Sequence, residues 1–185
     1  MDAESDHEGR LKKDSGLVSD AIAQRLKREV SLVFGVYGGA ISDLWDALPR
    51  NGLGYVCPMH EQSAGFMAEG YCKIAGFGVV ITTSGPGALN IVTCLGNCFY
   101  DSVPVLFITG QVNTRFMRPD DSVRQIGFQE TDIVSVAKPL TKAAVTVKCA
   151  EDVLPTLDSL IDEAKTGRPG PVLLDLPIDV QKSSL

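Results

Sequence analysis

Residues 79–90, VVITTSGPGALN, join an apolar run to a segment of helical period. The run is short, rich in β-branched residues and continuous rather than alternating, which is typical of a strand buried on both faces. Ser84 is a helix-capping residue type and Pro86 suits a first helical turn, so a helix should follow at once. Gly85 and Gly87 let the backbone approach a ligand closely. The stretch therefore predicts a buried strand that turns directly into a helix.

The same alternation of strand and helix signals runs along the chain. The clearest strand candidates are 32–36, 79–82, 105–108 and 172–176, and weaker ones are 55–57 and 143–147. Segments of helical period lie between them, at 17–27, 40–48, 61–75, 87–100, 129–137 and 152–165. Such repeats predict an α/β fold with an open parallel sheet of about six strands and helices on both faces. Ligands bind such sheets at the carboxyl ends of the strands.

Composition fits one globular domain. The 185 residues are 44% hydrophobic and 22% charged, which supplies enough apolar material for a core. Residues 1–16 are rich in charge, serine and glycine, so we expect a disordered leader or an expression remnant there. The folded domain is predicted to cover residues 17–185.

Charge and cysteine content narrow the class of protein. A net charge of -6 with scattered basic residues argues against binding nucleic acid, and no apolar run is long enough to predict a membrane span. The five cysteines follow no tight framework, which favours reduced thiols and a cytoplasmic protein. Cys94 and Cys98 share a helix face and could bind a metal, but buried small side chains are the favoured interpretation.

Glycines mark two of the strand-to-helix junctions. Gly38 and Gly39 follow the strand at 32–36, and either a close ligand approach or an ordinary turn would explain them. Residues 83–90 could also bind a phosphate as a P-loop does, but that interpretation fails because no lysine and no Walker pattern follows. A tight turn that carries ligand contacts remains.

The third junction places Glu61 at the start of the helix predicted for residues 61–75. An advance of about 100° per residue puts small residues on the same face as Glu61. These residues are Ala64, Gly65, Ala68, Cys72 and Ala75, whereas Gln62, Glu69 and Lys73 share a face expected to be solvated. A carboxylate at the end of a small-residue stripe would be drawn into a close helix contact, which favours a functional acid. The alternative is a charge that complements the helix dipole.

Taken in order, the junctions resemble the pyrimidine-binding domain of thiamine-diphosphate enzymes of the acetohydroxyacid synthase and pyruvate oxidase group. The matching stretches are VFGVYGGA (33–40), HEQSAGFMAEGYCKIAG (60–76), TTSGPGALN (82–90), PVLFITGQV (104–112), GFQETDIV (127–134) and GRPGPVLLDLPIDVQ (167–181). Together they cover almost the whole of residues 17–181, and the ordered set is far more specific than any one stretch.

The resemblance implies roles for individual residues. Glu61 would hydrogen-bond the aminopyrimidine ring of thiamine diphosphate and promote its imino tautomer. Gly38, Gly39, Gly85, Pro86 and Asn90 would shape the pocket around that ring. Phe128 and Gln129 would lie near the substrate, although an ordinary core aromatic is an equal alternative for Phe128.

The resemblance also implies parts that this sequence lacks. Members of the group hold the diphosphate and magnesium in another domain, with a Gly-Asp-Gly run that is absent here. That domain would act in cis or in trans, and a homodimer or higher oligomer would form through the small-residue face around Glu61. Pro177-Ile178-Asp179 stands where acetohydroxyacid synthases carry Pro-Lys-Asp, so the 2-oxo acid substrate is left open.

Three hypotheses about the chain's role follow. The first is the amino-terminal domain of a longer enzyme that decarboxylates or joins 2-oxo acids. The second is a complete small subunit of a split two-chain decarboxylase. The third is a non-enzymatic interaction module that keeps the fold without turnover.

Overall fold

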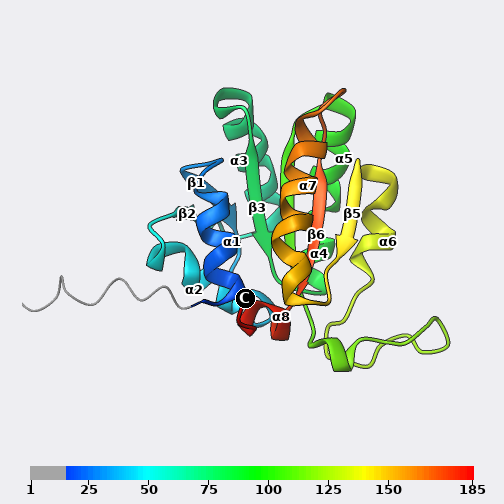
Figure 1. The fold of residues 1–185 in the computed structure, drawn as a ribbon. Coiled ribbons are helices and arrows are strands. Elements are labelled where there is room, and N and C mark those ends of the chain that lie inside the picture. The colour runs from blue at the N-terminus through cyan, green and yellow to red at the C-terminus, as the bar shows by residue number, and fades with distance from the viewer. Residues whose placement is uncertain (1–15) are drawn as a thin grey trace, which may run out of the picture.

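One parallel sheet organises the structure, a computed structural model that describes residues 16–185 (Figure 1). Its strands are β1 (Leu32–Gly35), β2 (Gly54–Val56), β3 (Gly78–Thr82), β4 (Val105–Gln111), β5 (Ala143–Thr146) and β6 (Val172–Pro177). They lie in the order β2-β1-β3-β4-β6-β5, and every neighbouring pair is parallel. The predicted α/β fold is confirmed. Apart from Gly16, the leader predicted for residues 1–16 lies outside the described residues.

Helices cover both faces of the sheet (Figure 1). They are α1 (Val18–Leu26), α2 (Ser42–Arg50), α3 (Glu61–Ala75), α4 (Pro86–Leu89), α5 (Val92–Asp101), α6 (Ile133–Ala137), α7 (Val153–Lys165) and α8 (Ile178–Lys182). Buried residues of α1, α2 and α7 share one core with the sheet, and those of α3, α5 and α6 share the other. In the part of the chain that is described, none of these helices has the length and apolarity to cross a membrane.

The two cores form because successive strand residues point to opposite faces. In β3, Val79 and Ile81 pack with α1, α2 and α7, whereas Val80 packs with α3 and α5. In β4, Leu106 faces the first core and Phe107 the second, and all five side chains are fully buried. These strands carry continuous apolar runs because helices cover both faces of the sheet, so every side chain along the strand is buried.

Two helices differ from the prediction. The helix expected at 87–100 is split into α4 and α5, because the Ile91 amide bonds to Ala88 O and interrupts the α-helical ladder. The helix expected at 129–137 begins only at Ile133, since Gln129 has a left-handed φ of 63° that a helix cannot contain. The short helix α8 was not predicted.

Helix α3 has the predicted bounds, but its faces are used differently. Ala64, Gly65, Ala68 and Cys72 are buried against the sheet and α5. A Cβ on Gly65 would overlap Cys94 Sγ. These small residues are thus buried within the domain and are not available for the subunit contact that was expected of them.

Glu69 also contradicts the sequence prediction. It was expected on a solvated face, yet its side chain is buried between α3 and α5. Its Oε1 accepts a hydrogen bond from Lys73 Nζ at 2.6 Å, and its Oε2 accepts one from Asn97 Nδ2 at 2.7 Å. The carboxylate is tolerated there because both oxygens have donors.

The cysteines of the second core are buried side chains, as expected. Cys94 and Cys98 are fully buried, and burial together with the Glu69 carboxylate raises the pKa of Cys94 to about 11. Over residues 16–185, no group of three or more histidine, cysteine, aspartate or glutamate side chains is placed to hold a metal ion.

Packing at Gly65 gives a test of the fold. We expect Gly65→Ala to lower the free energy of unfolding by about 1–3 kcal/mol, because the added methyl overpacks the α3–α5 contact. Gly70→Ala is the matched control on the same helix, since a Cβ there meets nothing within 4 Å. It should instead raise stability by about 0.5–1 kcal/mol. Urea unfolding measures both, and equal effects of the two substitutions would contradict the assigned packing.

Candidate cofactor-binding site

Glu61 lies at the first turn of α3, where the chain leaves β2. Its Oε2 accepts a hydrogen bond from Asn90 Nδ2 at 2.8 Å. His60 caps the helix, since its Nδ1 accepts from the Gln62 amide at 3.2 Å. Glu61 is half-buried, and no donor among the described residues reaches its Oε1. One oxygen is therefore fixed by the protein and the other is available to a ligand.

Glycines bring the three strand-to-helix junctions into contact. A Cβ on Gly38, after β1, would lie 2.6 Å from Thr83 Oγ1, after β3. A Cβ on Gly87 would lie 2.7 Å from Thr83 Cγ2 and 3.3 Å from Glu61 Oε1. These approaches are possible only without side chains, so the glycines let the junctions pack closely around Thr83, and Gly87 keeps a side chain away from Oε1. Thr83 lies at the centre of this contact, and the sequence analysis did not single it out.

Gly85 joins the site to a segment distant in sequence. It has a left-handed φ of 57°, and a Cβ on it would lie 2.6 Å from Gln129 O. Gln129 is thus seated on the turn that precedes α4. Phe128 beside it is 84% exposed, so the alternative of a core aromatic is wrong.

Two of the expected site residues make no contact of this kind. Gly39 starts a short 3-10 helix (Gly39–Ile41), and a Cβ on it would meet nothing within 4 Å. Pro86 occupies the first turn of α4, where it fixes the helix start. The structure therefore brings together Gly38, Glu61, Gly85, Asn90 and Gln129, and leaves Gly39 and Pro86 outside this group.

Glu61 also satisfies the helix-dipole alternative, because a carboxylate in the first turn of α3 complements the positive end of that helix. The two roles are compatible. What the dipole alone does not explain is the bond from Asn90, which fixes the orientation of the carboxylate.

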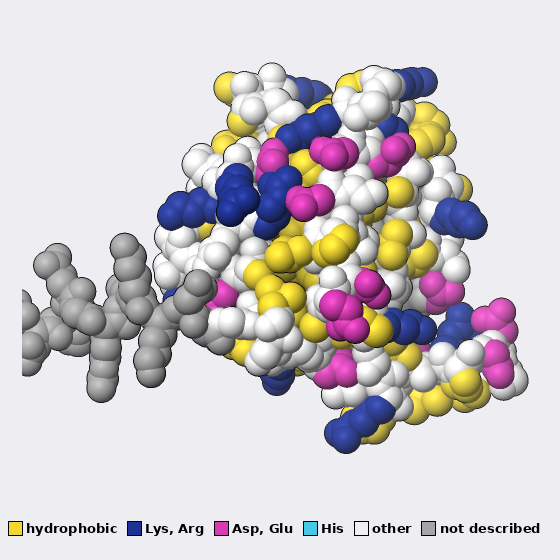
Figure 2. Space-filling model, viewed as in Figure 1, with side chains coloured by type: hydrophobic (Ala, Val, Ile, Leu, Met, Phe, Trp, Pro, Cys, Tyr) yellow, Lys and Arg dark blue, Asp and Glu magenta, His cyan; other side chains and the backbone are white. Residues whose placement is uncertain are grey.

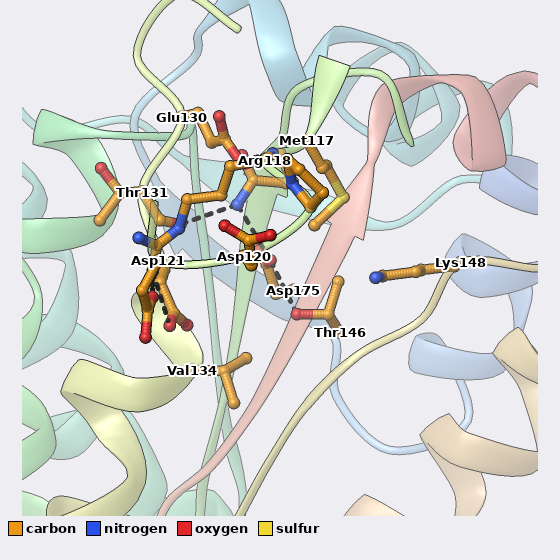
Figure 3. Close-up of a pocket in the computed structure, with 13 residues that line it drawn as sticks. Met117, Arg118, Asp120, Asp121, Glu130, Thr131, Val134, Thr146, Lys148 and Asp175 are labelled. Atoms are coloured by element: carbon orange, nitrogen blue, oxygen red, sulfur yellow. Dashed lines mark hydrogen bonds and ion pairs between the residues drawn. The ribbon is translucent and has the colours of Figure 1, made fainter. Parts of the chain in front are cut away.

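A separate cavity of about 330 Å³ opens at the carboxyl ends of β4, β5 and β6 (Figure 3). Asp175 of β6 is almost fully buried beside it and accepts bonds from Thr109 Oγ1 at 2.8 Å, Gln111 Nε2 at 3.1 Å and Thr146 Oγ1 at 3.1 Å. Burial raises the pKa of Asp175 to about 7, although these three donors oppose the rise. Sequence analysis missed this residue, and a lone acid inside the apolar run at 172–176 was the available signal.

An acid at the start of a helix and glycine turns at the carboxyl ends of an all-parallel sheet are typical of an α/β domain that binds a ligand at that edge. Residues 17–136 match the family model described as thiamine pyrophosphate enzyme, N-terminal TPP binding domain. This match covers more than half of the chain, and the chain belongs to this family.

Individual relatives agree with the family. The chain is 43% identical over 161 residues to the mitochondrial acetolactate synthase catalytic subunit of Saccharomyces cerevisiae, covering 86% of this chain and 23% of that protein. It is 41% identical over 172 residues to the acetolactate synthase large subunit of Haemophilus influenzae, covering 91% and 29%. With the isozyme 2 large subunit of Escherichia coli the identity is 42% over 156 residues, covering 84% and 27%. The chain thus spans about a quarter of the length of these relatives.

The buried Asp175 predicts how stability depends on pH. Between the ordinary pKa of 3.8 and about 7, the folded protein retains the Asp175 proton while the unfolded chain has lost it. The Asp175 carboxyl therefore makes its whole contribution to the free energy of unfolding below about pH 4. That contribution falls as the pH rises and is lost by about pH 7, at a rate of at most about 1.4 kcal/mol per pH unit. Urea unfolding at pH 5 and pH 8 should show this loss in the wild type and not in Asp175→Asn. Exposed Asp46→Asn is the control for charge, and a loss that persists in Asp175→Asn would contradict the assignment.

Proposed function

We propose that Glu61 binds the aminopyrimidine ring of thiamine diphosphate, and that the chain is the pyrimidine-binding portion of an enzyme acting on 2-oxo acids. The observation that carries the proposal is the Asn90–Glu61 hydrogen bond, which orients a half-buried carboxylate at the carboxyl end of the sheet. Family membership supports the cofactor, and the names of the relatives support 2-oxo acid chemistry. Those relatives favour neither the split subunit nor the interaction module.

The residues present fit an aminopyrimidine. Such a ring needs a carboxyl group that can exchange a proton with a ring nitrogen, and Glu61 Oε1 has no competing donor among the described residues. It also needs a flat space beside that oxygen. Gly87 keeps a side chain away from Oε1, because a Cβ there would lie 3.3 Å from that oxygen.

In this proposal the protein's residues hold and move protons while the cofactor carries the bond-breaking chemistry. When bound, thiamine diphosphate supplies a carbon nucleophile and accepts the electron pair left when carbon dioxide departs. Glu61 would hold and release a proton at Oε1, and Asn90 would keep Oε2 fixed so that Oε1 stays aimed at the ring. Phe128 and Gln129 would face the substrate from beside Gly85.

Diphosphate and magnesium would be held by another domain or chain. The sequence has no Gly-Asp-Gly run, and residues 16–185 contain no cluster of acids, histidines or cysteines suited to a metal. We also propose that the protein works in a reducing compartment, with the cytoplasm as the expected one. Cys72, Cys94 and Cys98 support this, because they are buried free thiols.

The partner surface would be the outward face of α3, which carries exposed Phe66, Met67 and Ile74, with exposed Met59 just before the helix. Large exposed apolar side chains on one helix are typical of an interface. Met59 lies two residues before Glu61, so the exposed apolar surface reaches the end of α3 that holds the acid. We therefore assign it to contact with the diphosphate-binding region of a second copy of the protein.

Glu61→Gln tests the assignment of the acid. It removes the exchangeable carboxyl proton and preserves side-chain size, so we expect turnover to fall by about 100-fold or more. The measurement is carbon dioxide release from pyruvate by the chain joined to a matching diphosphate-binding region, with thiamine diphosphate and magnesium added. Glu151→Gln, which removes an exposed charge elsewhere, is the control. Undiminished turnover in Glu61→Gln would defeat the assignment.

Met67→Glu tests the partner surface. A buried charge in an apolar contact is unfavourable, so the dissociation constant of the assembly should rise by about tenfold or more. Sedimentation velocity of the assembled protein measures it. Val136→Glu makes the same change at an exposed apolar residue of α6 and should leave assembly intact. Equal effects of the two substitutions would reject the α3 face.

A further inference from the structure

Glu130 is a buried carboxylate whose two oxygens both accept from backbone amides. Oε1 accepts from the Arg118 amide at 2.5 Å, and Oε2 accepts from the Ile126 amide at 2.9 Å. These amides lie at the two ends of segment 118–126, which protrudes from the carboxyl edge of the sheet after β4 (Figure 1). Arg118 and Glu130 lie together at the edge of the cavity in Figure 3. Both ends of the protruding segment are thus fastened to one side chain.

Backbone bonds carry this fastening to Phe128 and Gln129. The Glu130 amide donates to Gly127 O at 3.0 Å and closes a tight turn with Phe128 and Gln129 at its corner. The Gly127 amide donates to Phe116 O at 2.9 Å. The turn is therefore tied at its base to the chain that leaves β4.

The other side of this turn is held by the sheet. Gln111, at the end of β4, donates from Nε2 to Thr131 O at 2.8 Å. Residues 127–131 consequently have little freedom to shift, and Gln129 is kept in a left-handed conformation that a free chain would seldom adopt.

The corner of the turn is where the chain meets the Glu61 site. Gln129 rests on Gly85, whose lack of a side chain permits the contact. Phe128 projects into solvent beside it, and Figure 2 shows exposed hydrophobic side chains on the protruding segment at the lower right. An exposed aromatic held rigidly beside a ligand site is suited to contact a substrate.

We propose that Glu130 is a positioning residue: by bracing segment 118–126 it sets Phe128 and Gln129 against Gly85, at the substrate side of the Glu61 site. This inference rests on the proposed function for the identity of the substrate, a 2-oxo acid. Glu130 itself touches no reacting atom. Its carboxylate suits the task because it presents acceptors only, and both facing groups are donors.

Glu130→Gln separates this role from general stability. The substitution preserves size but turns one acceptor into an NH2 group, which faces a backbone N–H and cannot accept from it. Exposed Asp120→Asn is the matched control in the same segment, because Asn can still accept from the Ser122 amide that Asp120 binds at 2.8 Å.

The first readout is NMR of the full chain. In Glu130→Gln, amide hydrogen exchange at Arg118 and Ile126 should accelerate by about tenfold, and the nuclear Overhauser contact between Gly85 and Gln129 should disappear. Amides of β4 should keep their slow exchange, and in Asp120→Asn the Arg118 and Ile126 amides and the Gly85–Gln129 contact should behave as in the wild type. Slow exchange at Arg118 and Ile126 together with an intact Gly85–Gln129 contact in Glu130→Gln would overturn the proposal. If that variant does not fold, Glu130→Asp, which keeps the charge and shortens the reach, gives the same readout.

The second readout is kinetic, in the complete enzyme with thiamine diphosphate and magnesium. Glu130→Gln should raise KM for the 2-oxo acid by about tenfold while the dissociation constant of thiamine diphosphate stays unchanged. An unchanged KM in a variant that has lost the Gly85–Gln129 contact would overturn the positioning role. If the wild type turns over no 2-oxo acid, the proposed function fails, and the NMR contact alone decides whether Glu130 positions the turn.

Discussion

The hydrogen bond between Asn90 and Glu61 joins two strand-to-helix junctions, and much of the surrounding structure is arranged around it. Asn90 reaches Glu61 from the break between α4 and α5, where the Ile91 amide leaves the α-helical ladder. Next to it, α3 and α5 approach closely, which Gly65 permits by leaving room for Cys94. Helix break, small-residue packing and acid orientation are therefore parts of one arrangement.

The fold was predictable where the signal was local. The buried strand at 79–82 and the bounds of α3 followed from side-chain periodicity and turn residues, and the structure agrees with both. Glu61 and Gly85 were brought forward because each stands at a junction between a strand and a helix, whereas Asn90 followed from the family resemblance.

The errors have long-range causes. Gln129 departs from helical geometry because it rests on Gly85, and Glu69 is buried because Asn97 of another helix supplies a donor. Neither partner is visible to a periodicity argument. Asp175 and Glu130 were missed for the same reason, since a buried carboxylate is recognised only when its donors are known.

The sheet's alternation of side chains has a consequence for engineering. Glu61, Asn90 and their glycine contacts depend on the layer formed by α3 and α5, whereas Val79, Ile81 and the helices α1, α2 and α7 form the opposite layer. Substitutions that fill or repack that opposite layer do not touch the contacts between α3 and α5. Stabilising substitutions are therefore best sought in the opposite layer, away from Ile41 and the segment that carries Gly38, and libraries for directed evolution can be divided along the same line.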